Sequence, residues 1–505
     1  QKDIMIKNTT DRFSTRINLD QKINKSFNMF FRLGASYNIN NMFTPGDTYY
    51  TNRPIDSPYN PDGSYVIKFY NQLPDAEYND DKQNAAAVMG NIGASLTFFP
   101  WLKYTTTNGV DFSSVNENRY ESDRTFSGRS NAYANKAQSN QFNWTSMHRL
   151  NFDKQYKRNN ISVMLGGEAR ENQRRSVGST GWDFANDNIR EVSYAVNTTG
   201  TSSADENAGL SYYGQLNYSF DKRYSLIASF RNDGNSDFGS DVRWAAFKSA
   251  GVAWTISNEK FWKLKSVNFA KLKFSYGTNG NSRIGAYVSK GIYDFNSDNS
   301  YNGEPGAVMS KGENPVLSWE KTYLLNTGLA LGFFNNRISV EGEYYRNTTK
   351  DLLDNVSVSW TSGARSILQN VGSVRNSGVE FTLNTRNVVK ENFEWSTNFN
   401  IAHNTNKILA LYNNNDKVLD TRIRRVGMDV NSWYLIRWAG VDPRDGAGMW
   451  YDARGNLTKN YNIANRVVVG TSTPDAFGGM TNRFQFKGIT LSALVIYTVG
   501  GKNFS

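Results

Sequence analysis

The sequence predicts an all-β protein, a transmembrane antiparallel β-barrel, and three observations lead to this fold class. Apolar and polar residues alternate with a period of two over many segments. Short turns alternate with long polar loops along the chain. The chain has no apolar run long enough for a transmembrane helix, so an integral membrane protein with this sequence must cross as a closed barrel.

The alternation is clearest in residues 26–40, SFNMFFRLGASYNIN. Odd positions from 27 to 39 are apolar or aromatic, whereas the even positions are mostly small or polar and include Arg32. A period of two indicates a strand whose two faces meet different environments. We expect the odd positions to face lipid and Arg32 to face a wet lumen. Residues 13–23 alternate in the same way, and the short link after them predicts a hairpin with 26–40.

Further strand pairs follow along the chain, each joined by a short turn. They are 92–98 with 102–112, 142–152 with 161–165, 212–220 with 224–230, 317–334 with 338–347, 378–389 with 393–404, and 484–486 with 489–501. The sequence predicts about fourteen to sixteen strands of about nine to fourteen residues, long enough for tilted spans. No helix is predicted.

The long connections are predicted as polar loops over residues 41–83, 113–140 and 166–209. Outer-membrane barrels have short periplasmic turns and long extracellular loops, which is the asymmetry seen here. Aromatic residues gather near strand ends, as in an interfacial girdle; they are Phe98 and Trp101, Phe333 and Phe334, and Phe393 and Trp395. A soluble, secreted β-rich protein that binds glycans is the alternative.

Composition excludes several functional classes. Without cysteine, the chain has no disulfide, thiolate metal site or cysteine nucleophile. The net charge of +11 is modest over 505 residues and indicates a mixed solvated surface, so we predict no nucleic-acid partner. The first residues lack the pattern of a signal peptide and lead directly into a strand.

Candidate catalytic residues are few. Both histidines, His148 and His403, fall within predicted strands, and neither belongs to an HExxH or GxSxG motif. Glu341 and Glu343 lie on one strand face about 7 Å apart, a spacing that could suit the carboxylate pair of a glycosidase. Because Ile338, Val340 and Tyr344 alternate with them, we interpret both glutamates as solvated charges of the lumen wall.

Two aspartate-rich segments could hold calcium, but they lack the spacing of an EF-hand. Asp-Pro and Asp-Gly sequences form turns on their own, so a turn is the preferred interpretation of both. The residues concerned are Asp442, Asp445 and Asp452, and Asp233, Asp237 and Asp241. We predict no enzyme, no catalytic, metal or cofactor-binding residue, and no cofactor; the ligand-binding residues stay unassigned.

Residues 315–353, PVLSWEKTYLLNTGLALGFFNNRISVEGEYYRNTTKDLL, resemble a passage of the SusC/RagA family of TonB-dependent outer-membrane transporters of Bacteroidetes. Other stretches resemble the family in the same order, including LKFSYGTNGN, NVGSVRNSGVEFTLNTRNV and WAGVDPRDGAGMWYDARGN. These matches cover most of residues 200–505, whereas residues 1–200 agree by strand rhythm more than by motif.

The resemblance implies part of a 22-stranded barrel with a plugged lumen, located in the outer membrane and contacting its lipid. It implies TonB-dependent uptake of oligosaccharides or peptides, a SusD-like surface lipoprotein as a lid, and a possible dimer of transporter–lid pairs. We expect residues 1–505 to be a barrel fragment without the N-terminal plug, the TonB box and the last strands. A non-importing channel or scaffold barrel is a further alternative.

Overall fold

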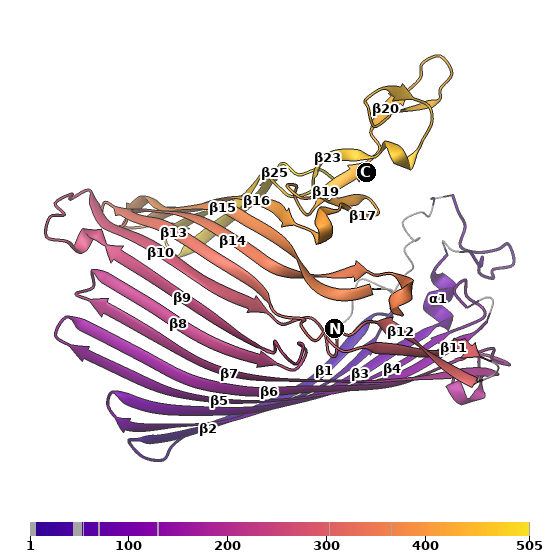
Figure 1. The fold of residues 1–505 in the computed structure, drawn as a ribbon, viewed down its shortest axis with the longest axis horizontal. Coiled ribbons are helices and arrows are strands. Elements are labelled where there is room, and N and C mark those ends of the chain that lie inside the picture. Colours follow the sequence, from indigo (N-terminus) through magenta and orange to yellow (C-terminus); the bar gives the residue numbers. More distant parts are fainter. Residues whose placement is uncertain are drawn as a thin grey trace. The chain divides into compact units, whose positions relative to one another are not determined.

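The computed structural model describes residues 7–43, 53, 55–68, 71–128, 131–301, 304–364 and 366–503. The chain divides into two compact units, Gln1–Asn151 with Gly166–Ser211 and Phe152–Leu165 with Tyr212–Ser505. Figure 1 follows the strands from indigo at the start of the chain to yellow at its end. No helix within the described residues is both long and apolar enough to cross a membrane.

Sixteen strands form an antiparallel sheet whose strand order follows the order along the chain. In the first unit these are β1 (Thr9–Lys22), β2 (Phe27–Asn41), β3 (Asp80–Phe99) and β4 (Leu102–Glu121). Residues of both units belong to β5 (Tyr133–Tyr156), β6 (Asn159–Trp182) and β7 (Asn197–Phe220). The second unit holds β8 (Tyr224–Asn235), β9 (Trp244–Thr255), β10 (Val267–Asn281), β13 (Glu320–Phe333), β14 (Ile338–Ser357), β15 (Ser366–Lys390), β16 (Phe393–Ala410), β24 (Ala476–Phe486) and β25 (Ile489–Val499).

Short elements lie in the long connections. Three small sheets are built from β11 (Ile292–Tyr301) with β12 (Glu304–Lys311), from β17 (Lys417–Leu419), β18 (Arg422–Arg424), β19 (Ser432–Leu435) and β23 (Val467–Thr471), and from β20 (Trp438–Val441), β21 (Gly448–Tyr451) and β22 (Leu457–Thr458). The helix α1 spans Leu73–Tyr78. Single 3-10 turns cover Val192–Tyr194, Ile256–Asn258, Trp360–Ser362, Tyr412–Asn414 and Ile463–Asn465.

The register of the first strands confirms that each has one apolar face. Leu19 of β1 lies opposite Phe31 of β2, and Phe31 lies opposite Ile92 of β3. All three side chains are exposed, as expected for residues that meet lipid in a single-layer sheet. Since the side-chain period is two, one register aligns the apolar residues of neighbouring strands on the same face.

The other face of these strands is polar, as predicted for Arg32. The guanidinium of Arg32 forms an ion pair with Asp20 of β1 and donates a hydrogen bond of 2.8 Å to the carbonyl of Leu19. Further along the same face, Gln83 donates to Glu117 at 2.8 Å. Polar side chains on this face therefore satisfy one another across strands.

Each predicted hairpin is present, but several strands are longer than predicted. The expected loops over 113–140 and 166–209 are wrong for most of their length, because β4 runs to Glu121, β5 begins at Tyr133, and β6 and β7 fill much of 166–209. The expected nine to fourteen residues hold for β1, β8, β9, β13, β24 and β25, whereas the other strands of the sheet are longer, with up to 25 residues in β15. A strand flanked by two paired neighbours satisfies its backbone hydrogen bonds whatever its side chains, so polar sequence continues the sheet.

The first long connection is shorter than the predicted loop over 41–83, because β3 already begins at Asp80. Part of the loop, residues 44–52, 54 and 69–70, lies outside the described residues. The prediction of no helix is wrong here, since α1 begins after Gln72 with Pro74 in its first turn. Proline suits that place because its missing N–H has no helical partner there.

Buried hydrophobic clusters are small and lie near the long connections. In the second unit Phe238, Ala245, Phe247 and Trp319 pack together, with 4.6 Å between the ring centroids of Phe238 and Trp319. At the opposite strand ends, beside the short turns, the predicted aromatic residues are found. Trp101 stacks on Phe99 with centroids 4.9 Å apart, as in an interfacial girdle.

Candidate functional site

The polar face of the second unit carries a row of small and charged residues across five neighbouring strands. In register order the row contains Ser225 of β8, Ala253 of β9, Lys273 of β10, Gly328 of β13 and Glu343 of β14. The opposite face of these strands is apolar and exposed. Its exposed residues include Val252, Leu272, Phe274, Tyr276 and Leu329.

Lys273 is the centre of an ion-pair cluster on this polar face. Its ammonium reaches over β13 to β14, where it donates to Glu343 Oε1 at 2.8 Å and also pairs with Glu341. The reach is possible because Gly328 has no side chain. A Cβ at position 328 would lie 3.0 Å from Glu343 Cγ, closer than an ordinary van der Waals contact.

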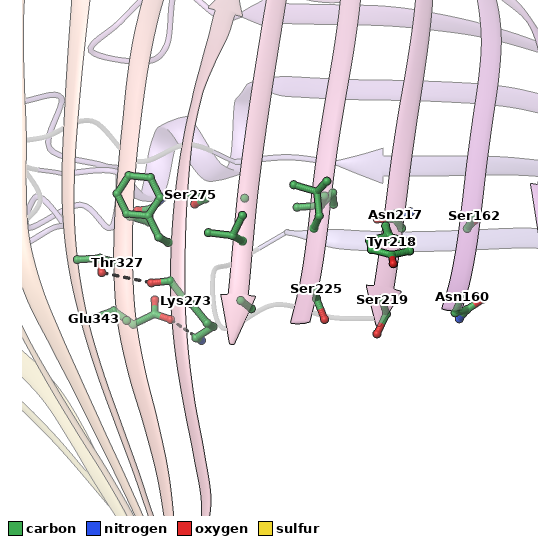
Figure 2. A pocket seen from close by; sticks show the side chains of 18 residues that line it. Asn160, Ser162, Asn217, Tyr218, Ser219, Ser225, Lys273, Ser275, Thr327 and Glu343 are labelled. Carbon is green, nitrogen blue, oxygen red and sulfur yellow. Dashed lines mark hydrogen bonds and ion pairs between the residues drawn. The ribbon is translucent and has the colours of Figure 1, made fainter. Parts of the chain in front are cut away.

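A hollow of about 630 Å³ lies against this row. Figure 2 shows Lys273 and Glu343 pointing toward one another at one side of it, with Ser225, Ser219 and Asn160 along the other side. The Thr327 hydroxyl donates to the carbonyl of Lys273 at 3.2 Å and so ties β13 to β10. Hydroxyls, amides and one ion-pair cluster line the hollow together with apolar residues such as Leu226, Ile227 and Ala253. The hollow can therefore hydrogen-bond polar groups of a ligand and also contact apolar ones.

The charge of the cluster is not balanced. Lys273 supplies one positive charge against the two carboxylates of Glu341 and Glu343, and Glu343 lies directly opposite Glu380 of β15. Like charges at directly opposite positions destabilise a sheet. Lys271 of β10 lies on the same face, in line with Glu341 through Ala330, so two lysines face three glutamates here. Lys273 is the lysine held between two of the carboxylates.

A second surface of interest is the small sheet β20–β21–β22 in the connection between β16 and β24. Trp438 lies opposite Trp450, with their rings edge to face at 5.4 Å between centroids, and Tyr461 packs edge to face on Trp450 at the same distance. Trp438 and Tyr461 are 57% and 62% exposed. Exposed apolar residues that form a contiguous patch mark interaction sites more often than single ones do.

Asp442 holds the turn between β20 and β21. Its carboxylate is 1% exposed and accepts hydrogen bonds of 3.1 and 3.0 Å from the guanidinium of Arg444. Lys459 reaches the same carboxylate at 2.6 Å and Asp445 at 2.5 Å. The Arg444 guanidinium and then the Lys459 ammonium hold the pKa of Asp442 well below its usual range.

Of the remaining aspartates, Asp452 stabilises a turn, whereas Asp233 lies within β8 and forms an ion pair along the strand. Asp452 accepts hydrogen bonds from the backbone N–H groups of Arg454 and Asn456 at 2.9 and 2.8 Å. Asp233 accepts from Arg231 at 2.6 Å, and the backbone N–H of Asp237 donates to Asn235 at 2.8 Å. The contacts of Asp452 and the Asp237–Asn235 bond are the usual stabilising bonds of Asx turns and short loops.

Both histidines are strand residues, as predicted. His148 of β5 contacts the Tyr104 hydroxyl through Nδ1 at 2.6 Å and the Ser146 hydroxyl through Nε2 at 3.1 Å. His403 of β16 contacts the carbonyl of Asp475 through Nδ1 at 2.5 Å.

The structure brings together Glu341 and Glu343, as the strand period predicted, but sequence reasoning missed Lys273. The two glutamates are members of an ion-pair cluster rather than singly solvated charges. A signal was present, since Lys271 and Lys273 alternate with Leu272 and Phe274 in AKLKFSY. The pairing of β10 with β13 and of β13 with β14 could not be read from that pattern.

Comparison with known proteins gives one family. The profile described as TonB dependent receptor-like, beta-barrel matches residues 8–503. The TonB-dependent receptor P3 of Formosa agariphila is 27% identical, over 99% of this chain and 55% of that protein. The TonB-dependent receptor SusC of Bacteroides thetaiotaomicron is 29% identical, over 92% of this chain and 47% of that protein.

Solved structures agree with this assignment. The structure of the RagAB peptide importer in the closed-closed state is similar with a TM-score of 0.86 and 26% identity, covering 98% of this chain and 58% of that one. The chain thus spans about half the length of the curated relatives that it matches. Taken with its long antiparallel strands and their lipid-type outer face, these matches show that the chain belongs to the TonB-dependent receptor-like β-barrels of the outer membrane, with SusC and RagA as relatives.

Proposed function

We propose that residues 1–505 form the barrel wall of a TonB-dependent importer. The importer carries oligosaccharides or peptides across the outer membrane, and a SusD-like surface lipoprotein covers it as a lid. The observation that carries the proposal is the family match over residues 8–503, on a sheet with one apolar and one polar face. In this proposal residues 1–505 form part of the barrel, and other segments of the protein provide the plug and the segment that contacts TonB. The proposed activity is gated passage of the cargo through the barrel, without a covalent step and without a cofactor.

The relatives support a polymer fragment as cargo. One is named SusC, and a solved neighbour is a peptide importer. The hollow beside Lys273 offers hydroxyl and amide groups that can bond either sugar hydroxyls or peptide groups. The Lys273 ammonium is already held by Glu341 and Glu343, so this part of the wall binds passing polar groups weakly. Weak binding favours release, which an importer needs as much as capture.

For the lipoprotein lid, the aromatic surface of Trp438, Trp450 and Tyr461 is the docking region that we propose. It lies in the connection between β16 and β24, one of the long connections, and long connections are extracellular in this class of barrel. Exposed tryptophan and tyrosine are the residues most enriched at the energetic centres of protein interfaces.

The test is uptake by cells that carry the complete gene, by cells with the gene deleted, and by complemented cells. Each strain receives fluorescent oligosaccharide pools and fluorescent peptide pools, with and without a protonophore. We expect deletion to abolish uptake of one pool and the protonophore to abolish it as well, because TonB depends on the proton gradient. Uptake that survives the protonophore would indicate a passive channel, and uptake of both pools unchanged by deletion would overturn the proposed import function.

A further inference from the structure

The turn between β9 and β10 differs from the other short turns of the second unit. It runs over residues 256–266, ISNEKFWKLKS, whereas β7 is joined to β8, β13 to β14, β15 to β16 and β24 to β25 by two to four residues. The 3-10 turn Ile256–Asn258 begins it, and the Trp262 indole N–H donates to the carbonyl of Val267 at 2.8 Å. The turn is therefore held by internal hydrogen bonds rather than being an irregular loop.

The single acid of this turn is neutralised within the protein. Glu259 accepts from the guanidinium of Arg223 at 2.8 Å, from the Tyr224 hydroxyl at 2.6 Å and from the Trp254 indole at 3.0 Å. Those three partners leave no carboxylate of the turn for its lysines. Glu259 instead fixes the turn against β8 and β9.

Three lysines of the turn remain exposed. Lys260, Lys263 and Lys265 occur within six residues, and each is exposed to solvent. None of the three lysines forms an ion pair with another residue that the structure describes. The three lysines and Glu259 give residues 256–266 a net charge of +2, and the carboxylate of Glu259 is paired with Arg223 rather than with the lysines.

Apolar side chains stand beside these lysines. Phe261 is 63% exposed and Leu264 56% exposed. The ring of Phe261 packs edge to face on Trp254, with 6.4 Å between centroids. Trp254 lies opposite Tyr224 and Leu272 in the register, on the apolar face of the sheet. The turn therefore continues the lipid-facing surface beyond the strand ends.

We propose that this turn, residues 256–266, binds the anionic headgroups of phospholipids in the inner leaflet of the outer membrane. The antiparallel strand order places this turn at the same edge of the sheet as the turns of two to four residues. Short turns of such barrels lie on the periplasmic side, where that leaflet ends. Exposed aromatic residues insert at the headgroup level, and lysines beside them attract anionic lipid. Phe261 continues the lipid-facing surface of the sheet, and this continuity favours a membrane over a soluble protein as the partner.

The proposal is tested on the full-length protein, purified in mild detergent and titrated with phosphatidylglycerol or with phosphatidylcholine. Native mass spectrometry counts the bound lipids and gives their dissociation constants. In the K260Q/K263Q/K265Q variant we expect binding of phosphatidylglycerol to weaken by about fivefold per lysine, hence by roughly a hundredfold in all. Binding of phosphatidylcholine is expected to stay unchanged, and 10-fold excess inorganic phosphate is expected not to compete.

A matched control removes three exposed lysines beside other short turns, as K22Q/K25Q/K390Q. The control is expected to keep most of the phosphatidylglycerol binding, and F261S is expected to weaken binding of both lipids. Equal losses in the two triple variants would overturn the proposal in favour of general attraction to a basic rim. Unchanged binding in K260Q/K263Q/K265Q, or full competition by phosphate, would also overturn it. Unchanged thermal unfolding of each variant in neutral detergent verifies that it is folded.

Discussion

At the scale of single residues, the ion-pair cluster depends on a residue that carries no charge. Lys273 and Glu343 are separated by 70 positions in the sequence and by the strand β13 in the sheet. A side chain at position 328 would crowd Glu343, because its Cβ would lie 3.0 Å from Glu343 Cγ and 3.2 Å from Glu343 Oε1. The cluster is about one-third to two-fifths exposed, so each of its ion pairs contributes at most about 1 kcal/mol.

The first prediction compares two glycines on neighbouring strands. Gly328→Val is expected to push Glu343 away from Lys273 and to lower the free energy of unfolding by about 1 kcal/mol relative to Gly342→Val. Gly342 is the control because a Cβ there would meet no atom within 4 Å. Unfolding by guanidinium in lipid vesicles measures the free energy of unfolding of both variants. If the loss comes from the ion pair, Gly328→Val has little further effect in a Lys273→Gln background; equal effects of the two valines would contradict this account.

The second prediction concerns Asp442, which lies outside the membrane-spanning strands. Its pKa in the folded protein is below the ordinary value of 3.8, so the ionised form stabilises the turn. That stabilisation is complete above the ordinary pKa and is lost as the pH falls below it toward the folded value. Hydrogen exchange of residues 442–456 is therefore expected to lose protection at pH 3 compared with pH 6.

The Asp442→Asn variant is expected to show low protection already at pH 6 and little further change at pH 3. Asp445→Asn is the control, since its carboxylate is more exposed and is held by Lys459 and by the backbone N–H of Ala447 but not by Arg444. Equal protection of the wild type at both pH values would contradict a role for the Asp442 carboxylate in holding this turn.

At the scale of strands, the sequence predicts best where both faces have a clear character. The hairpin around Asn335 and the hairpin of 378–389 with 393–404 were predicted close to their observed turns, because apolar and polar positions alternate up to the turn. Prediction failed where strands leave the lipid. There the alternation of apolar and polar residues disappears, and segments such as 113–121 look like loops although they continue β4.

The site was predictable only in part for a related reason. A strand period places Glu341 and Glu343 on one face, because both belong to the same segment. Lys273 lies on another strand, and its meeting with them depends on two strand pairings and on the absence of a side chain at Gly328. The helix α1 was missed because six residues are too few for a helical period, although Pro74 and Asp75 are typical of a helix start.

The third prediction tests which face of a strand meets lipid. Phe274 and Ser275 are neighbours in the middle of β10, with Phe274 exposed on the apolar face and Ser275 on the polar face. Phe274→Arg is expected to cost about 2–4 kcal/mol and to reduce membrane insertion. Ser275→Arg is expected to insert normally. The heat-modifiable band on SDS gels reports folding, and equal insertion of the two variants would contradict the assignment of the faces.

At the scale of the whole molecule, the chain is part of a barrel wall of the TonB-dependent receptor family, and we propose that this wall belongs to an importer with a lid. In this proposal the apolar face meets lipid, the polar face lines the path of the cargo, and the aromatic surface in the connection between β16 and β24 docks the lipoprotein. The chain spans about half the length of its curated relatives, so its function must be tested in the complete protein.

The most direct test is purification of the full-length protein from outer membranes in mild detergent, followed by mass spectrometry of everything that remains bound. The account predicts a stoichiometric surface lipoprotein together with a bound oligosaccharide or peptide. It also predicts that the lipoprotein is lost from a Trp438→Ala/Tyr461→Ala variant but kept in a variant with Tyr412→Ala, another exposed aromatic residue of the same long connection. A folded barrel that never carries a lipoprotein, with or without these substitutions, would contradict the proposed lidded importer.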